Sequence, residues 1–558
     1  MAHFTIDSGA RASALDRPVF EAAMEEMRRA IGAEHVATSG EALERAARAT
    51  IPHPQRPSAL LRPGSADEVA EIVRIAQRHR IPLWPVSQGR NWGYGSGTPA
   101  LANTAVLHLG RLDRIIEVNE ELAYAVIEPG VTYRQLRAHL DAHHPRLWCD
   151  CTDGPPEGSV IGNALDRGLG VTHYADHFGT LCGLEVVLPS GERLRTGGGP
   201  EGCPTFHTHK WGVGPYMEGL FSQSNFGVVV KAGVWLLPKP EAFASFTFDL
   251  ARAQDLPQLV DAMRELALAG VLQSACHLIN DVVALAVLAQ YPPGAVERYS
   301  RLPDAVLAAM RARYRVPAWS LGGGLLGTRA QVREIKRQLR RRLAPLGRIL
   351  FVDDRVAALG GRLAAMAKGS ALGRAVASAA ANVSGRSLEM LAAGPHVHSV
   401  LKGIPSDYFV RHAYFKSRHA KPDVADPDRD DVGLIWFAPI APMTGAHVER
   451  VIGLCRPLFE RHEFDFYCAL LLQNARSMIT LMSIYFRKEV AGEAERAAAL
   501  YAALGAATHA AGYQPYRVSV AGMAGPTVGG ADSSRTALRA MKGALDPGTV
   551  MAPGKYGI

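Results

Sequence analysis

The chain has 558 residues, of which 48% are hydrophobic and 20% charged, and a chain of this length is expected to form two or three soluble domains. Its formal net charge of +8 is modest and its basic residues are scattered, which argues against nucleic-acid binding. The seven cysteines include no Cys-x-x-Cys pair, so neither a disulfide framework nor a metal site is predicted. The first residues lack the pattern of a signal peptide, and the most apolar windows, such as residues 363–383 with Lys368 and Arg374, are interrupted by charges, so we expect a cytoplasmic protein that does not enter a membrane.

The first 240 residues alternate short strand patterns with amphipathic helix patterns. Ser65 and Glu68 have the spacing of a capping box, and the helix that follows them is expected to end near Arg80. The other helix patterns cover residues 18–31, 40–48 and 131–143. Strand patterns cover residues 81–85, 105–109, 115–118, 124–128 and 226–230, and a hairpin covers 184–194. This is an α+β pattern, which lacks the regular βαβ alternation of a Rossmann domain.

The stretch from Pro85 to Pro99 combines glycines with short polar side chains. Backbone N–H groups of such a loop can approach a ligand without interference from Cβ atoms, and successive amides around one concavity bind a diphosphate. Arg90 and Tyr94 belong to the same loop, which places an aromatic hydroxyl between two glycines. The alternative interpretation is a glycine-rich turn that joins two strands.

Two further segments, 147–164 and 214–230, are also rich in glycine and short polar residues. Several such loops in one domain fit a dinucleotide better than a single phosphate. After Pro240 the composition shifts towards Ala, Leu and Arg, which indicates a domain boundary. Inside this second part, residues 322–327 match Gly-x-Gly-x-x-Gly, but no acidic residue follows in 340–350, so we interpret them as close packing of a strand on a helix.

The last fifty residues are again polar and aromatic, and we expect them to return to the first domain. Tyr516 precedes Arg517, and a phenol beside a guanidinium can bind an anionic aromatic ligand because both groups donate to one oxygen. Simple stacking of the arginine on the tyrosine is the alternative.

Four motifs of the sequence resemble, in content and in order, motifs of the vanillyl-alcohol oxidase and 4-cresol dehydrogenase (p-cresol methylhydroxylase) family of flavoproteins. They are Gly89–Gly95, Gly158–Ala164, Gly219–Gly227 and Ala552–Lys555, and the similarity runs from about residue 55 onwards. The resemblance implies an α+β fold. Residues 1–241 would form an N-terminal arm and a PCMH-type FAD-binding domain of two α+β subdomains, and residues 242–511 would form an α+β cap domain with an antiparallel sheet. Residues 512–558 would return to the FAD-binding domain.

The resemblance also implies roles for individual residues. Tyr94, Tyr516 and Arg517 match the tyrosines and arginine that bind the substrate's phenolic oxygen, and Asp153 matches the acid-base aspartate, although residues 154–157 depart from the family pattern. Leu434 stands where many members link FAD through a histidine, so dissociable FAD is expected. The residues expected to bind FAD are Pro85, Ser87, Gly89, Arg90, Asn91, Gly93, Gly95, Gly158, Ser159, Gly162, Asn163, Ser224, Gly227, Val228 and Lys555.

The function implied by the resemblance is FAD-dependent oxidation of 4-alkylphenols or 4-hydroxybenzyl alcohols. Hydride would pass from the benzylic carbon to flavin N5, and the resulting quinone methide would give an alcohol by hydration, an aldehyde or an alkene. Molecular oxygen or a cytochrome c would be the electron acceptor, and a homodimer is expected. Oxidation of a hydroxy acid or sugar lactone on the same fold is the alternative function.

Overall fold

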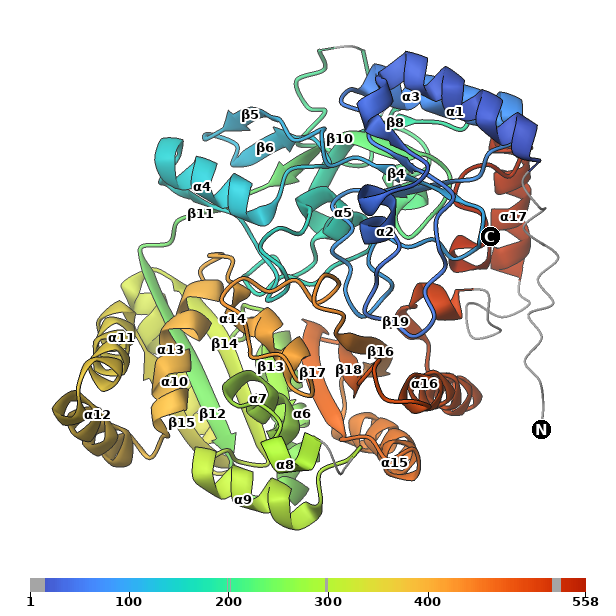
Figure 1. The fold of residues 1–558 in the computed structure, drawn as a ribbon. Coiled ribbons are helices and arrows are strands. Elements are labelled where there is room, and N and C mark those ends of the chain that lie inside the picture. The colour runs from blue at the N-terminus through green and yellow to red at the C-terminus, as the bar shows by residue number, and fades with distance from the viewer. Residues whose placement is uncertain (1–15, 198, 201, 297–299, 524–532) are drawn as a thin grey trace.

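The computed structural model describes residues 16–558 except 198, 201, 297–299 and 524–532. Figure 1 shows two parts, one above the other, which are joined where the chain passes from β11 (Leu237–Pro238) to β12 (Ala242–Leu250). The upper part carries both ends of the described chain, and the lower part is built around one large sheet. The mixture of helices with antiparallel sheets is the α+β class expected from the sequence.

The upper part contains three small sheets. The first sheet has the order β1-β2-β4-β3, and β4 is parallel to β2 and β3. The second sheet is antiparallel and has the order β5-β6-β10-β8-β9. The third sheet pairs β11 with β7. The strands are β1 (Val36–Ala37), β2 (Leu60–Leu61), β3 (Leu83–Val86), β4 (Ala105–His108), β5 (Ile115–Asn119), β6 (Tyr124–Ile127), β7 (Leu147–Trp148), β8 (Leu181–Val187), β9 (Arg193–Arg195) and β10 (Val228–Trp235). The helices are α1 (Arg17–Ile31), α2 (Glu41–Ala46), α3 (Ala66–His79), α4 (Tyr133–His143) and α5 (Val160–Leu165).

Helix α3 begins and ends as its sequence predicts. The Ser65 hydroxyl accepts a hydrogen bond from the Glu68 amide, which satisfies one of the free N–H groups of the first turn. The apolar face of the helix, which includes Val69, Ile72 and Val73, is fully buried in a hydrophobic cluster with α1 and with strands of the four-stranded and five-stranded sheets. The helix stops at Arg80, whose φ of 53° is left-handed.

The lower part is an eight-stranded antiparallel sheet of order β15-β12-β14-β13-β17-β18-β16-β19. Besides β12, its strands are β13 (His277–Asn280), β14 (Trp319–Gly327), β15 (Gly347–Val352), β16 (Gly433–Pro442), β17 (Tyr467–Asn474), β18 (Ser477–Phe486) and β19 (Pro515–Arg517). The helices around it are α6 (Leu256–Leu268), α7 (Asp281–Leu288), α8 (Pro293–Val296), α9 (Asp304–Tyr314), α10 (Arg329–Leu343), α11 (Asp354–Gly369), α12 (Ala371–Ser384), α13 (Leu388–Val400), α14 (Asp407–Val410), α15 (Gly445–Arg461) and α16 (Glu493–Ala510).

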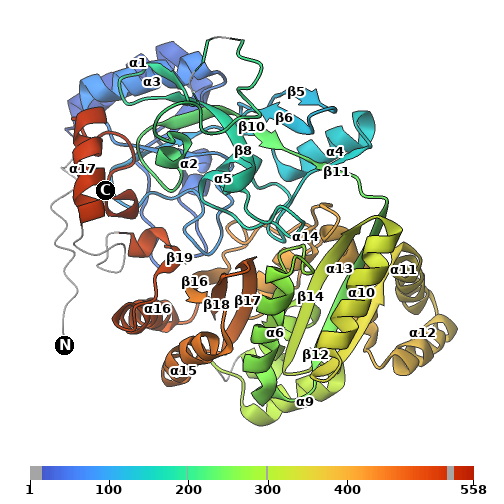
Figure 2. The same ribbon diagram turned by 180° about the vertical axis from the view of Figure 1, so that it is seen from behind.

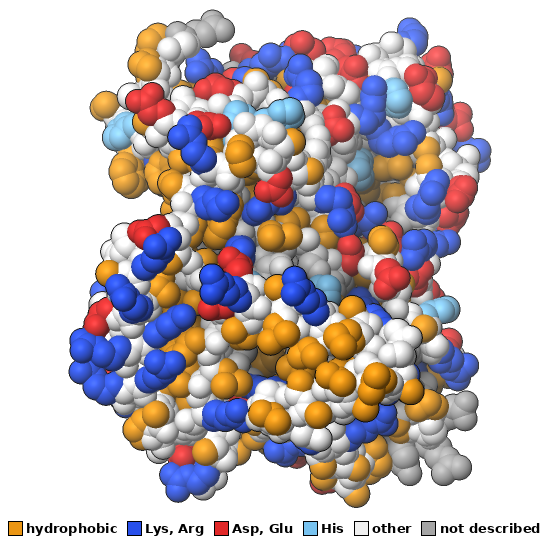
Figure 3. All heavy atoms as spheres, turned by 90° about the vertical axis from the view of Figure 1, so that its left-hand side faces the viewer, with side chains coloured by type: hydrophobic (Ala, Val, Ile, Leu, Met, Phe, Trp, Pro, Cys, Tyr) orange, Lys and Arg blue, Asp and Glu red, His pale blue; other side chains and the backbone are white. Residues whose placement is uncertain are grey.

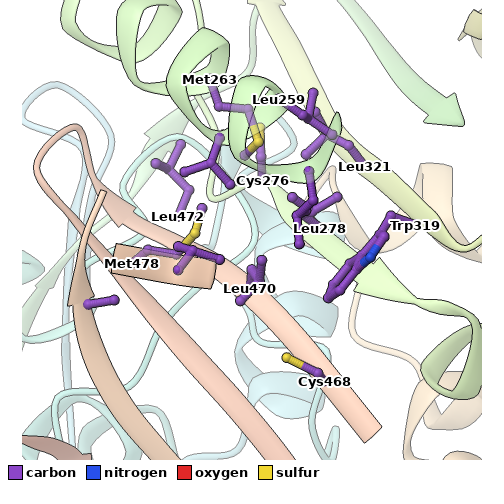
Figure 4. Close-up of a cluster of buried hydrophobic side chains, with 14 of the residues drawn as sticks. Leu259, Met263, Cys276, Leu278, Trp319, Leu321, Cys468, Leu470, Leu472 and Met478 are labelled. Atoms are coloured by element: carbon purple, nitrogen blue, oxygen red, sulfur yellow. The ribbon is translucent and has the colours of Figure 1, made fainter. Parts of the chain in front are cut away.

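The two faces of this sheet have different environments, because successive side chains of a strand point to opposite sides. One face packs on α6, α10, α15 and α16 and forms the largest hydrophobic core of the described chain. Figure 4 shows part of this core, where Leu259 and Met263 of α6 lie over Leu278, Leu321 and Leu470. The opposite face lines a cavity that is described below.

The glycine run at 322–327 ends β14 directly before α10, and this strand packs on that helix, as our interpretation of the run expected. These residues lie within β14, where Gly322 and Gly323 pair with Thr247 and Phe246 of β12. A Cβ atom on Gly323 would lie 2.6 Å from Cys276 Sγ, so the run allows close packing within the sheet.

The segment after β19 lies beside the first helices of the chain (Figures 1 and 2). It contains α17 (Ser533–Leu545), and Met551 forms a parallel bridge with Leu83 of β3. Strand β19 itself belongs to the eight-stranded sheet, so residues 515–517 join the lower part before the chain reaches the upper one. Within the described residues, no helix has the length and apolar character needed to cross a membrane.

Candidate functional site

A cavity of about 190 Å³ lies in the upper part, at the end of β3. The loop that follows β3, the first turn of α5, residues 223–229 and residues 551–555 surround it, so four segments distant in sequence meet here. Backbone hydrogen bonds join β3 to the last of these segments: the Leu83 amide donates to the Val550 carbonyl at 2.8 Å, and the Ala552 amide donates to the Leu83 carbonyl at 2.7 Å.

The lining of this first cavity has the chemistry that a dinucleotide requires. Gly89 has a φ of 64°, which a glycine adopts without strain, and its Cα lies close to Gly97 across the loop. Gly162 lies so near the loop that a Cβ atom there would be 2.9 Å from Ser87 Oγ. Backbone amides and short hydroxyl and amide side chains therefore form the polar part of the wall, and these residues fit the diphosphate of FAD.

Most residues expected to bind FAD line this cavity. They are Pro85, Ser87, Gly89, Arg90, Asn91, Gly158, Ser159, Gly162, Asn163, Ser224, Gly227, Val228 and Lys555.

Two residues of that expectation, Gly93 and Gly95, do not line the cavity. The Gly93 amide donates to Thr50 Oγ1 at 2.8 Å, and a Cβ atom on Gly93 would lie 2.7 Å from the ring of Trp436. Gly95 is packed in the same way against Val520. These two glycines allow the loop to contact the large sheet and the segment after β19, which is a packing role.

Carboxylates from the lower part fix the glycine loop. Arg90 Nη1 donates to Asp426 Oδ2 at 2.7 Å, and Asp428 accepts hydrogen bonds from Trp92 Nε1 at 2.9 Å and Ser96 Oγ at 2.8 Å. Burial raises the pKa of Asp428 to about 7 although both hydrogen bonds oppose the shift. The Arg90 side chain is thus engaged by a carboxylate of the lower part.

A second cavity, of about 580 Å³, opens from the first. Arg90, Asn91, Tyr94, Asn163 and Arg517 line both, so these residues mark the junction. From there the second cavity extends along the face of the eight-stranded sheet that is not covered by α6, α10 and α15.

Tyr94, Tyr516 and Arg517 meet at this junction. The Arg517 guanidinium carbon lies 5.5 Å from the ring centre of Tyr94 and 5.2 Å from that of Tyr516. Arg517 is paired with Ala438 of β16, and its Nε donates to the Asp166 carbonyl at 2.7 Å, so its side chain is fixed from two sides. The residues come from opposite ends of the chain, and the Val520 amide donates to the Tyr94 carbonyl at 2.9 Å.

The protonation states at the junction follow from burial. Burial raises the pKa of Tyr94 and of Tyr516, and the nearby Arg517 opposes both shifts, so both phenols are neutral donors. Burial alone would lower the pKa of Arg517, but the electrostatic interactions with Tyr516, Asp166 and Tyr94 outweigh the effect of burial, so the pKa of Arg517 is raised. The Tyr516 hydroxyl donates to the Arg167 carbonyl. None of the described residues hydrogen-bonds to the Tyr94 hydroxyl, which is available for a ligand.

Asp153 lines the second cavity but is the most exposed of the residues assigned a catalytic role. Its side chain is 49% exposed, and its Oδ2 lies 3.6 Å from His277 Nδ1 of β13. The loop that carries it continues through Gly154 and Pro155, which also line the cavity. The carboxylate is therefore accessible to solvent and has a histidine beside it.

Several residues of the site escaped the sequence prediction. His177 is buried, with Nδ1 at 3.0 Å from the Tyr133 hydroxyl and 2.7 Å from Asn163 Oδ1, while Nε2 lies 3.5 Å from Asp150 Oδ2. Tyr133 and Asn163 line the first cavity, so this network holds part of its wall. A lone histidine has no sequence spacing that would reveal such a role.

Leu434, which stands at the family's flavin-linking position, has His412 and Tyr414 as the nearby candidates for a covalent link, and the three side chains have different surroundings. Leu434 is buried and lines the second cavity. His412 lines it too, stacks on Trp436 and lies 2.8 Å from the Tyr485 hydroxyl, and burial lowers its pKa to about 4. Tyr414 lines neither cavity and donates to Asp430 Oδ2 at 2.6 Å, which is a structural role.

Comparisons with known proteins identify the family of the chain. Residues 57–197 match the FAD binding domain family. The chain is 37% identical over 540 residues to 1'-carboxy-chondrochloren decarboxylase of Chondromyces crocatus, covering 96% of this chain and 97% of the relative. It is 28% identical over 516 residues to the 4-cresol dehydrogenase [hydroxylating] flavoprotein subunit of Pseudomonas putida, covering 90% and 88%.

The solved structure of 4-ethylphenol oxidase from Gulosibacter chungangensis, in its isoeugenol complex, superposes with a TM-score of 0.85 at 27% identity, covering 98% of each chain. The PCMH-type fold, the dinucleotide chemistry of the first cavity and a relationship that spans almost the complete chain lead to one conclusion: the chain belongs to the 4-cresol dehydrogenase and vanillyl-alcohol oxidase family and is an FAD-dependent oxidoreductase.

Proposed function

We propose that the enzyme oxidises para-substituted phenols, such as 4-alkylphenols or 4-hydroxybenzyl alcohols, at the benzylic carbon. The observation that carries the proposal is the convergence of Tyr94, Tyr516 and Arg517 where the two cavities meet. A cation within about 4–6 Å favours the ionised form of an acid, so Arg517 would stabilise a bound phenolate. Tyr94 would donate to the same oxygen, and Tyr516 could do so by exchanging its present acceptor, the Arg167 carbonyl.

The clamp would prepare the substrate for oxidation. Negative charge held at the phenolic oxygen is delocalised to the para carbon and weakens the benzylic C–H bond towards loss of hydride. FAD, when bound, supplies the hydride acceptor. Loss of hydride from the phenolate leaves a neutral para-quinone methide, and the interaction with Arg517 is fixed before the reaction, as electrostatic catalysis requires.

Asp153 would act on the second half of the reaction. As a base it would take a proton from the water that attacks the benzylic carbon, which gives an alcohol, and general base catalysis of this kind contributes about a hundredfold to ten-thousandfold. His277, 3.6 Å from the carboxylate, would then accept or share that proton. A 4-hydroxybenzyl alcohol would instead give the aldehyde.

The extensive identity to a decarboxylase favours a second candidate, oxidative decarboxylation. If the carbon next to the benzylic one bears a carboxylate, the quinone methide can accept the electron pair of the breaking C–C bond. Carbon dioxide leaves, an alkene forms, and the ring regains its phenolate. The same clamp serves both reactions, so the substituent of the substrate would decide between them.

Anaerobic mixing tests these proposals with the FAD-loaded enzyme. 4-Methylphenol, 4-hydroxybenzyl alcohol and 3-(4-hydroxyphenyl)propanoate should bleach the flavin, whereas 3-methylphenol should not, because a meta substituent cannot form a para-quinone methide. 4-Vinylphenol and carbon dioxide from the propanoate would establish decarboxylation. Bleaching by 2-hydroxy acids or sugars and not by phenols would refute the phenol proposal and support the alternative function.

The same anaerobic mixing experiment identifies the electron acceptor. Reoxidation on admission of oxygen would identify an oxidase, and persistence of the reduced flavin until cytochrome c is added would identify a dehydrogenase. We also propose that FAD is held without a covalent bond, because Leu434 has no nucleophilic atom and Tyr414 is engaged by Asp430.

A further inference from the structure

The second cavity is larger than a single phenol ring requires. At about 580 Å³ it lies in the range of roughly 300–1,000 Å³ that is typical of sites for drug-sized ligands. It begins at Tyr516 and Arg517 beside β16 and continues past β17, β13 and β14 to Asp249 of β12. Its lining therefore includes residues from most strands of the large sheet.

Small side chains on one face of the sheet create this space. Gly322 of β14, Ala469 of β17 and Ser245 of β12 line the cavity, whereas their neighbours in sequence Phe246 and Leu470 point to the opposite, packed face. A Cβ atom on Gly322 would meet a single atom within 4 Å, the Phe246 carbonyl oxygen at 3.6 Å. A side chain at position 322 would project into open space.

The length of the cavity can be estimated from the sheet order. Five spacings separate β16 from β12, and neighbouring strands lie ~4.8 Å apart, which gives ~24 Å. An extended chain covers ~3.5 Å for every three covalent bonds, so a molecule of roughly twenty bonds in length would span the cavity.

The far end of the cavity differs from its middle. Asp249 Oδ2 lies 2.9 Å from Arg386 Nη1, and Arg386 Nη2 donates to Thr247 Oγ1 at 3.2 Å, so a compensated ion pair lines the cavity there. Beside it, Val356 of α11 lines the cavity and is 49% exposed, which places an opening at this helix. Figure 3, which faces the α11–α12 side, shows hydrophobic side chains gathered around a hollow.

We propose that the physiological substrate is a phenol whose para substituent is an extended, largely apolar chain that occupies the second cavity as far as Gly322. This inference rests on the proposed phenol site, and it specifies the substituent that the site selects. The apolar walls bind the chain by the hydrophobic effect, and the opening beside α11 admits it from a surface that is itself apolar.

Binding of phenols that cannot be oxidised tests the inference in the FAD-loaded enzyme. 4-Methoxyphenol and 4-(decyloxy)phenol have an oxygen where the benzylic carbon would be, so calorimetry measures their affinity alone, below the concentration at which the longer one self-associates. Burial of the additional methylenes should make the decyloxy compound at least a hundredfold tighter. In Gly322→Val the part of that gain that comes from the end of the chain should disappear while 4-methoxyphenol binds as in the wild type.

Gly453→Val is the matched control, because Gly453 is exposed on α15, lines neither cavity and has no atom within 4 Å of its Cβ position. It should retain the full gain. Equal affinity of the two phenols, or a chain-length gain that Gly322→Val leaves intact, would overturn the long-chain inference while the phenol site stands. Failure of both phenols to bind would instead contradict the proposed function.

Discussion

Replacement of Arg517 tests the clamp most directly, because its guanidinium is the positive charge nearest the proposed phenolate. At a separation of about 4 Å between that charge and a bound phenolate oxygen, two unit charges interact by ~4 kcal/mol at an effective dielectric constant of about 20. One pKa unit corresponds to ~1.4 kcal/mol, so the charge alone would lower a phenol's pKa by up to about 3 units. Burial of the phenolate opposes this, so a net shift of about 1 to 3 units is expected.

The measurement is a spectrophotometric pH titration of bound 4-nitrophenol, whose ionised form absorbs visible light. In the wild type its pKa should lie below that of free 4-nitrophenol, and in Arg517→Met it should rise to the free value or above it. Arg167→Met is the control, since that guanidinium donates to Ser222 Oγ and lines neither cavity. An unchanged pKa in Arg517→Met, with the flavin spectrum intact, would refute the electrostatic argument.

Three other predictions concern the base, the loop and the flavin. Asp153→Asn should slow water addition to the quinone methide by about a hundredfold or more, measured as alcohol formed from 4-methylphenol, and wild-type yields would exclude Asp153 as the base. Burial raises the pKa of Asp428 from 3.8 to about 7, so the free energy of unfolding falls as the pH rises through this interval, by at most ~4 kcal/mol. Between about pH 5 and pH 8, Asp428→Asn should therefore lose less thermal stability than the wild type. Melting temperatures that change in parallel with pH in the two proteins would contradict this. Acid precipitation should release the flavin, whereas a yellow washed pellet would show a covalent link.

Sequence patterns predicted the parts of the fold that depend on neighbouring residues. The capping residues of α3 and the strands flanking the glycine loop follow local rules, and the lining of the first cavity follows from where glycine and short polar residues cluster. The glycines at 322–327 match a nucleotide-binding motif because such a motif and a tightly packed strand use the same residue for different reasons. The missing acidic residue argues against the motif, and the pairing with β12 and β13 places the glycines within a strand.

What the sequence could not reveal depends on contacts between distant segments. Asp428 holds Trp92 across 336 positions, and His177 acts through Tyr133 and Asn163. Neither residue has a partner at a recognisable spacing, so no local pattern marks it. The size of the second cavity was equally hidden, because small residues on one face of a strand look like ordinary sheet positions until the covering helices are known.

The alternation of the large sheet also bears on how substrate range can diverge within such a family. Residues such as Phe246 and Leu470 stabilise the packed face, while Ser245, Gly322 and Ala469 shape the cavity from alternate positions of the strands. A substitution of the second kind changes the length of chain that fits without removing a core contact. Under the proposed function, single substitutions of this kind would exchange short substrates for long ones at little cost in stability, while the residues proposed to bind the phenol and the flavin remain the same.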